Sequence, residues 1–171
     1  MTYSDELTLA MTWLGEKGDT IFLGQSVAYP GNAVYKTLSG VPMEKRVELP
    51  VAEELQLGAS IGLALTGKTV ISIFPRMDFL MCCMNQLVNH LDKGLYTGTG
   101  KVIIRVCVGS TKPMHPGLQH CGDYTEAFKK LLKNICVLKI DLESRASIFY
   151  QVAYKNPGSY LLVEYGDLYN D

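Results

Sequence analysis

Hydrophobic positions along the chain fall into short runs that alternate with longer amphipathic segments. The short runs are rich in Val, Ile and Leu, which is typical of β-strands buried on both faces of a sheet. Several end at a proline or a glycine, residues that commonly terminate a strand. This pattern predicts strands at residues 20–24, 46–49, 68–74, 102–108, 136–140 and 160–163.

The longer segments carry apolar residues at helical spacing. The clearest stripe begins after Asp78 and recurs at intervals of 1, 3, 3, 1 and 3 residues, as one face of a helix requires. We predict helices from the N-cap Ser4 to Gly18, and at 51–66, 78–93, 124–133 and 144–154. Small residues in the second of these favour a central, buried helix. The stripe after Asp78 consists of Leu80, Met81, Met84, Leu87, Val88 and Leu91.

Two stretches, 25–45 and 109–122, show no clear period and are expected to be long loops. A long loop in a compact domain is normally functional or part of an interface. Strands that alternate with helices imply a parallel sheet covered by helices on both faces. The chain is therefore predicted to be one α/β domain spanning residues 1–171, with an open, mostly parallel sheet.

Ligands of such sheets bind outside the carboxyl ends of the strands. The best candidates for a functional site are therefore the loops that follow Gly24, Leu49, Phe74 and Val108. They contain the unusual polar and aromatic residues of the sequence: an acidic helix start, an Arg-x-Asp-Phe segment and a region with two histidines. The predicted functional edge thus coincides with the residues best suited to chemistry.

Composition narrows the functional classes. Of 171 residues, 47% are hydrophobic and 19% charged, which suits a real core and argues against disorder. The net charge of −1 gives no basis for binding nucleic acid. We see no uninterrupted apolar run of about 18 residues, which a membrane span requires, and the polar N-terminus is unlike a signal peptide. Five cysteines without a C-x-x-C pattern suit buried free thiols in a reducing compartment, so we expect a cytoplasmic protein.

Two polar clusters are candidates for chemistry. Glu53 and Glu54 open a helix, where acidic residues either complement the helix dipole or supply a functional carboxyl group. The segment from His115 to Asp123 holds two imidazoles, a thiol and a carboxylate, but its spacing matches no standard metal pattern. A cysteine nucleophile activated by His120 is also disfavoured, because neighbours in sequence rarely align for proton transfer. Phosphate-binding loops of the G-x-G-x-x-G and G-x-x-x-x-G-K-[ST] types are absent from the sequence, as is a Gly-Asp-Gly with a later Asn for a magnesium diphosphate.

Several segments resemble one family in the same order along the chain. They are the first seven residues, the loop around Gly31, the stretch Arg46-Val-Glu-Leu-Pro-Val-Ala-Glu53 with its continuation to Gly67, Asp78-Phe79, and Asn85-Gln86-Leu-Val-Asn89 followed by Lys93. The chain resembles the pyrimidine-binding (Pyr) domain of transketolase-type thiamine-diphosphate (ThDP) enzymes. It is most similar to that of the beta subunits of pyruvate and branched-chain 2-oxo acid dehydrogenases. The resemblance extends to about Ile140 and is most specific between residues 46 and 93.

This resemblance implies roles for four residues. Glu53, in Pro-Val-Ala-Glu, matches the catalytic glutamate whose carboxyl group hydrogen-bonds N1′ of the cofactor's aminopyrimidine. Phe79 matches the aromatic residue that stacks on the pyrimidine ring, and the neighbouring Asp78 also matches. His120, in Leu-Gln-His-Cys, resembles the histidine that faces the substrate carbonyl, although the family's next residues, Ser-Gln, are Cys-Gly here. His115 is the alternative.

The resemblance also implies a partner. The family's cofactor lies between a Pyr domain and a diphosphate-binding (PP) domain, and no PP elements are found in this sequence. A separate PP subunit would then hold the diphosphate and Mg²⁺, in a heterotetramer or larger assembly, with no metal ligands in this chain. Two alternatives are a non-catalytic Pyr homologue that acts as a scaffold or regulator, and an unrelated α/β domain that binds a small ligand.

Overall fold

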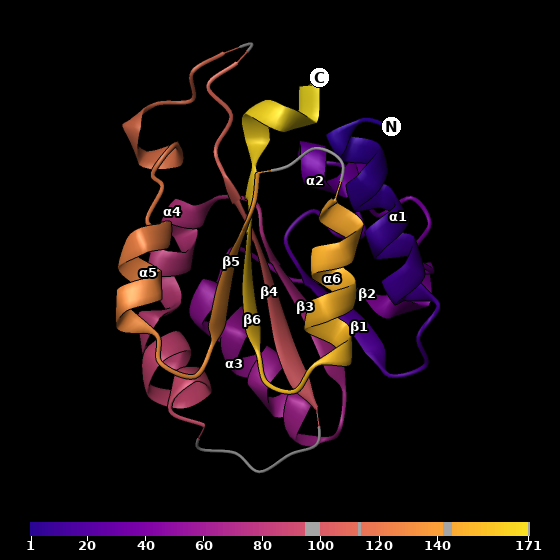
Figure 1. Ribbon diagram of the computed structural model, residues 1–171, viewed down its shortest axis with the longest axis vertical. Helices are drawn as coiled ribbons and strands as arrows, with labels where there is room; N and C mark the ends of the chain where they lie inside the picture. Colours follow the sequence, from indigo (N-terminus) through magenta and orange to yellow (C-terminus); the bar gives the residue numbers. More distant parts are fainter. Residues whose placement is uncertain (95–99, 113, 142–144, 171) are drawn as a thin grey trace.

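Six parallel strands form one sheet in the computed structural model, which describes residues 1–94, 100–112, 114–141 and 145–170 (Figure 1). The strand order is β2-β1-β3-β4-β6-β5, and every neighbouring pair is parallel. The α/β class predicted from the sequence is confirmed. The strands are β1 (Thr20–Gly24), β2 (Arg46–Glu48), β3 (Thr69–Phe74), β4 (Lys101–Val108), β5 (Cys136–Ile140) and β6 (Tyr160–Tyr165).

Helices cover both faces of the sheet (Figure 1). One face packs against α1 (Tyr3–Gly15), α2 (Ala33–Lys36) and α6 (Ala146–Lys155), and the other against α3 (Glu53–Leu65), α4 (Met77–Leu80) and α5 (Thr125–Leu131). Successive residues of a strand point to opposite faces, so each face has its own core. In β3, Ile71 and Ile73 face the α1 side, whereas Val70 and Phe74 face the α3 side. No helix in the described ranges is both long and apolar enough to cross a bilayer.

The N-terminal helix begins earlier than Ser4, the N-cap predicted from the sequence. Thr2 is the N-cap: its hydroxyl accepts from the Asp5 amide at 3.2 Å, while the Asp5 carboxylate accepts from the Thr2 amide at 2.9 Å. This reciprocal capping box satisfies two amides at once, which a cap at Ser4 does not offer. The last turn ends at Gly15, and Lys45 donates to the Gly15 carbonyl oxygen at 2.7 Å.

Segment 25–45 is more structured than a long loop. It contains α2 and a 3-10 turn at Met43–Lys45, and its apolar side chains complete the core beneath α1. Arg46 ties the segment down by donating from Nε to the Val41 carbonyl oxygen at 3.0 Å. The sequence showed no helical period because each helical piece is a single turn. The buried side chains are those of Val27, Val34, Leu38 and Val41.

A carboxylate organises the loop that follows β1. Glu48, the last residue of β2, accepts hydrogen bonds from the amides of Ser26, Val27 and Ala28 at 2.6, 2.8 and 2.8 Å. Ser26 takes a left-handed backbone conformation, with φ of 55°, which lets consecutive amides converge on one group. The neighbouring strands β1 and β2 are thereby joined at their carboxyl ends.

The helix predicted at 78–93 is three different helical segments. It starts one residue earlier as α4, passes through a 3-10 turn at Met81–Cys83 and continues as a π-helix at Asn85–Asp92. These changes of pitch rotate the buried face, so Met81 is 46% exposed and Cys83 is buried in its place. The buried side chains of these segments are Met77, Leu80, Cys83, Leu87, Leu91 and Asp92. Helix α3 also differs from expectation, because its outer face is exposed at Leu55 and Leu65.

The five cysteines are all free thiols, but only two of them are buried. Cys83 and Cys107 lie in the two cores, Cys82 and Cys136 are exposed, and Cys121 is half-buried. Burial, together with the carboxylate of Glu164, raises the pKa of Cys107 to about 12. The expectation of buried thiols therefore holds for two of the five.

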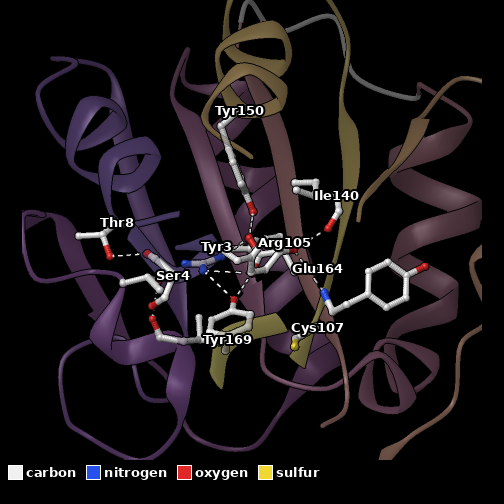
Figure 2. Close-up of polar contacts among 12 residues, drawn as sticks. Tyr3, Ser4, Thr8, Arg105, Cys107, Ile140, Tyr150, Glu164 and Tyr169 are labelled. Carbon is white, nitrogen blue, oxygen red and sulfur yellow. Dashed lines mark hydrogen bonds and ion pairs between the residues drawn. The ribbon is translucent and has the colours of Figure 1, made fainter. Parts of the chain in front are cut away.

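A buried ion pair lies at the centre of the sheet on the α1 side (Figure 2). Arg105 of β4 donates to Glu164 of β6 through Nε at 2.9 Å and Nη2 at 3.0 Å, and both side chains are fully enclosed. Tyr150 of α6 and Tyr169 also donate to the carboxylate, and Arg105 donates to the Tyr169 hydroxyl at 3.0 Å. Burial and the Glu164 charge raise the pKa of Tyr150 well above its ordinary value, so its hydroxyl remains a donor. Tyr3 closes the cluster, with its ring edge-on to that of Tyr169.

Replacing Glu164 by Gln should destabilise the protein strongly. The amide has nearly the same volume but leaves the Arg105 charge without a counter-charge in the core, which typically costs about 3–5 kcal/mol. Urea unfolding of the chain measures the change. Glu126→Gln is the control, since that carboxylate pairs with Lys129 and Lys139 on the exposed surface and its loss should barely move the midpoint. Equal stability of the two variants would contradict the expectation.

Candidate functional site

The candidate site residues all follow the carboxyl ends of neighbouring strands, with Glu53 in the helix after β2. The chain leaves β1 towards β2 on one side and places β3 on the other, so β1 and β3 flank the point where the strand order reverses. In open parallel sheets the crevice at such a point binds ligands. Gln25 follows β1 directly, Phe79 follows β3 in α4, and His120 lies in the connection after β4.

Glu53 is the buried carboxyl group at this edge of the sheet. It is the first residue of α3, only 8% exposed, and its Oε1 accepts from Nε2 of Gln25 at 3.2 Å. Pro50 precedes the helix, and the four residues 49–52 bring the chain from the edge strand β2 to the helix start. Acidic side chains are favourable in a first helical turn because they face the positive end of the helix dipole. Burial against Gln25 distinguishes Glu53 from a purely dipole-compensating residue.

Glu54 occupies a different environment although it is the next residue. It is exposed, and its Oε1 accepts from Asn85 Nδ2 at 3.2 Å and from Gln86 Nε2 at 3.1 Å. Adjacent helical residues point about 100° apart, which separates the two carboxylates. The structure thus places the Glu53 carboxylate against Gln25 and the Glu54 carboxylate on the outer surface between α3 and the π-helix.

Cys83 packs beside the start of α3. Burial, followed by the charges of Glu54 and Glu53, raises the pKa of this thiol to about 12, so it stays protonated at neutral pH. Its sulfur donates to the Leu80 carbonyl oxygen at 3.2 Å. Cys83 therefore contributes an apolar, uncharged wall next to the two carboxylates and is no nucleophile.

Phe79 and His120 meet although they are 41 residues apart. Their ring centroids are 5.4 Å apart with an interplanar angle of 86°, an edge-to-face contact. Both side chains are half-buried, so each retains a surface that a ligand can reach. His115, the alternative histidine, is exposed and its Nδ1 accepts from the amide of Gly117 at 3.0 Å. Of these two histidines, it is His120 whose ring contacts Phe79.

Asp78 is directed at the same connection. Its carboxylate oxygens lie 3.3 and 3.2 Å from the amide nitrogen of Gly122, and the Tyr124 hydroxyl donates to Oδ1 at 3.4 Å. The next carboxylate, Asp123, accepts from Thr125 and from Tyr165. Partial burial acts to raise the pKa of Asp123, but these hydrogen bonds outweigh it and lower the pKa. Asp123 is therefore a charged anchor of the loop.

Gly109 makes the close approach of His120 possible. A Cβ at this position would lie 1.7 Å from the carbonyl oxygen of His120 and 2.9 Å from Nη1 of Arg76. The strand end and the histidine loop therefore pack backbone against backbone. Reasoning from the sequence did not single out Gly109, Gln25 or Tyr124. Their signal was position alone, since each directly follows or borders a loop at the carboxyl edge.

The described residues bring no metal site together. Among them, no group of three or more His, Cys, Asp and Glu side chains could hold a metal ion. The cluster from His115 to Asp123 is spread over an extended loop with a short 3-10 turn, Leu118–His120. Its imidazoles and carboxylate serve separate contacts within that loop and to Phe79 and Tyr165.

The fold is shared with a solved structure from the transketolase class. A split-gene transketolase, described as an inactive beta4 tetramer, superimposes with a TM-score of 0.73 at 15% identity, covering 96% of this chain and 51% of that one. No family model matches the sequence. The likeness defines the class: this is an α/β domain with the fold of a transketolase-like Pyr domain.

Sequence relatives narrow this class. The 2-oxoisovalerate dehydrogenase subunit beta of Bacillus subtilis is 28% identical over 153 residues, covering 84% of this chain and 45% of that protein. The mitochondrial pyruvate dehydrogenase E1 component subunit beta of Caenorhabditis elegans is 29% identical, covering 80% and 41%. The corresponding subunit of Gracilaria tenuistipitata var. liui is 30% identical, covering 69% and 37%. The chain spans less than half the length of these relatives, and it matches a transketolase-like Pyr domain related to 2-oxo acid dehydrogenase beta subunits.

Gly109→Ala should lower the stability of the protein and displace His120 at the same time. The added methyl group has to displace the His120 backbone, and overpacking of this kind typically costs about 1–3 kcal/mol. Calorimetric unfolding measures the loss. In the matched control Gly62→Ala the methyl group meets nothing within 4 Å on the exposed side of α3, so helix propensity should stabilise the chain by up to about 1 kcal/mol. A Gly109→Ala variant as stable as the wild type would contradict this expectation, because the loop with His120 would then move away from the methyl group at no cost in stability.

Proposed function

We propose that this chain is the pyrimidine-binding subunit of a split, heteromeric ThDP-dependent enzyme of transketolase type, which decarboxylates 2-oxo acids or transfers two-carbon units from ketose-like donors. The observation that carries the proposal is the buried Glu53, which follows β2 at the carboxyl edge of the sheet, together with the ring contact between Phe79 and His120, which follow β3 and β4 at the same edge. The relationship to 2-oxo acid dehydrogenase beta subunits and the split-transketolase fold support it.

Glu53 is proposed to hold a proton against N1′ of the aminopyrimidine. A carboxyl group fits this task because it can accept or donate at the same atom, and its enclosure with Gln25 keeps bulk water away. When bound, ThDP supplies the carbon that adds to the substrate carbonyl and takes up the electron pair of the broken C–C bond. Glu53 is the residue of this chain that moves a proton at the cofactor.

Phe79 and His120 are proposed to form the rest of this chain's contribution. Phe79 offers a half-buried ring of the kind that stacks on a pyrimidine. His120, held at the rim, would face the substrate carbonyl as a hydrogen-bond donor or proton carrier. The contact between the Phe79 and His120 rings supports a shared site.

A separate PP-domain subunit is proposed to complete the site by holding the diphosphate and Mg²⁺, in a heterotetramer or larger cytoplasmic assembly. Two findings support a partner of this kind: the relatives are beta subunits, and the structural neighbour is a split-gene enzyme. The exposed outer face of α3, with Leu55 and Leu65, is apolar surface that an interface would bury.

The isolated chain should bind ThDP and Mg²⁺ only very weakly, because it presents one side of the cleft and none of the metal ligands. Titration calorimetry on the purified chain measures this, and repeating the titration with the candidate PP subunit should give much tighter binding together with a larger assembly by light scattering. Micromolar ThDP affinity without a partner would contradict the split-site proposal. A chain that stays monomeric beside the candidate would exclude that partner.

Glu53→Gln should lower turnover of the reconstituted complex by about 10²–10⁴-fold, the usual contribution of an acid–base group. Gln has the same volume and can still hydrogen-bond N1′, but it cannot exchange a proton. The loss should appear as slowed exchange of the thiazolium C2 proton, with a smaller change in ThDP affinity.

Glu54→Gln is the control for this variant. Its amide oxygen can still accept from Asn85 and Gln86 on the outer surface, so turnover should be nearly unchanged. A crippling effect of Glu54→Gln in place of Glu53→Gln would reverse the assignment of the catalytic carboxyl. If neither variant affects turnover, a scaffold or regulatory role is the better description. ThDP-independent binding of another ligand by the monomer would instead favour an unrelated ligand-binding domain.

A further inference from the structure

Asp78 and Phe79 hold one loop in two different ways. Phe79 contacts the imidazole ring of His120, while the carboxylate of Asp78 accepts from the Gly122 amide, two residues further along the same loop. Consecutive residues of a helix point about 100° apart, so Asp78 and Phe79 contact the loop from two different directions. Phe79 thus contacts the side chain of His120, and Asp78 contacts the backbone of the loop that carries His120.

The loop has further contacts to the same short helix. The Tyr124 amide donates to the sulfur of Met77 at 3.0 Å, and the Tyr124 hydroxyl donates to Asp78 at 3.4 Å. The Tyr124 ring folds over Gly122, where a Cβ would lie 2.5 Å from the ring atoms. Residues 120–124 therefore turn back onto α4, and Asp78 is the charged acceptor at the centre of that turn.

We infer that Asp78 is a positioning residue that fixes the His120 loop against Phe79, and that it acts on the reaction through His120. Both carboxylate oxygens lie within 3.3 Å of the Gly122 amide, so the charge of Asp78 is directed at the backbone of the loop. A hydrogen bond to a charged acceptor is stronger than one between neutral groups and suits a fixed attachment. This inference rests on the proposed function for its catalytic consequence, and its structural part concerns this chain alone.

A direct cofactor contact and a positioning role predict different results. If Asp78 touched the cofactor, its removal would weaken ThDP binding whether or not His120 were present. If it positions His120, its removal disturbs the imidazole before any cofactor is added. Loss of that position lowers turnover only while the histidine is there to be misplaced.

The first experiment is proton NMR of the imidazoles in the isolated chain. The sequence contains three histidines, so His90→Gln and His115→Gln assign the His120 signal by elimination. Phe79→Leu then shows how far the Phe79 ring shifts it. Asp78→Ala should move the His120 signal towards its position in Phe79→Leu, whereas Asp78→Asn, which retains an oxygen acceptor for Gly122, should largely preserve the wild-type signal. An unchanged His120 signal in Asp78→Ala would overturn the inference.

The second experiment is a double-mutant cycle in the reconstituted complex. Asp78→Ala alone should lower kcat by up to about 10²-fold with ThDP affinity unchanged, since small displacements of a catalytic group cost this much. In a His120→Ala background, the same change should cause no further loss. Additive losses, or weaker ThDP binding that Asp78→Asn does not repair, would identify Asp78 as a cofactor contact instead.

If Asp78→Ala does not fold, hydrogen exchange of the wild-type chain still tests whether Asp78 holds the His120 loop. The Gly122 amide should exchange slowly with deuterium because the carboxylate holds it, and fast exchange would overturn the inference. Failure of the proposed function is recognised separately. A complex without ThDP-dependent turnover would remove the catalytic role but leave the NMR and exchange results valid for Asp78 and His120.

Discussion

The buried Arg105–Glu164 pair is the interaction on which the rest of this structure depends. Two full charges lie in the middle of an apolar sheet, and their burial is tolerated only because each is hydrogen-bonded from several sides. The partners come from β4, β6, α6 and the C-terminal turn that carries Tyr169. A shift of β4 or β6 would separate the two charges, and a shift of α6 or of the C-terminal turn would remove a hydrogen bond from the Glu164 carboxylate.

This constraint extends from the core to the functional edge. The turn that delivers Tyr169 also carries Asp167, whose carboxylate accepts from the amides of Thr111 and Lys112 at 2.7 and 3.2 Å. Those residues begin the connection that leads from Gly109 to His120. The Asp167 carboxylate thus connects the C-terminal turn that carries Tyr169 to the start of the loop in which His120 lies.

The sequence was most informative where one physical rule dominates. Uninterrupted β-branched runs such as 69–74 predicted fully buried parallel strands, and alternation with helices predicted the layers. The site residues were predictable through a motif, because Pro-Val-Ala-Glu53 and Asp78-Phe79 are local in sequence. The residues that contact them could not be predicted in this way. Gln25 contacts Glu53, and Gly109 packs against the backbone of His120, only because the fold brings distant segments together.

Some of the predicted buried positions after Asp78 and the predicted N-cap of the first helix were wrong for an equally physical reason. A helical wheel assumes a constant pitch, and the change from α to 3-10 to π after Asp78 moved Met81 to the surface and Cys83 into the core. In the same way, the cap at Thr2 was decided by a reciprocal pair of hydrogen bonds with Asp5, which residue type alone does not distinguish from a cap at Ser4. The single-turn helix α2 is too short to leave any periodic signal.

The carboxylate of Glu48 also determines what this sheet edge can recognise. In many nucleotide-binding folds the loop after the first strand offers its converging amides to a phosphate group. Here those amides, from Ser26 to Ala28, already hold an anion that the chain itself supplies from the neighbouring strand. A soluble phosphate would have to displace a tethered competitor present at very high effective concentration. These amides are therefore occupied by a carboxylate that joins β2 to the loop after β1, and they are not open to an incoming phosphate group.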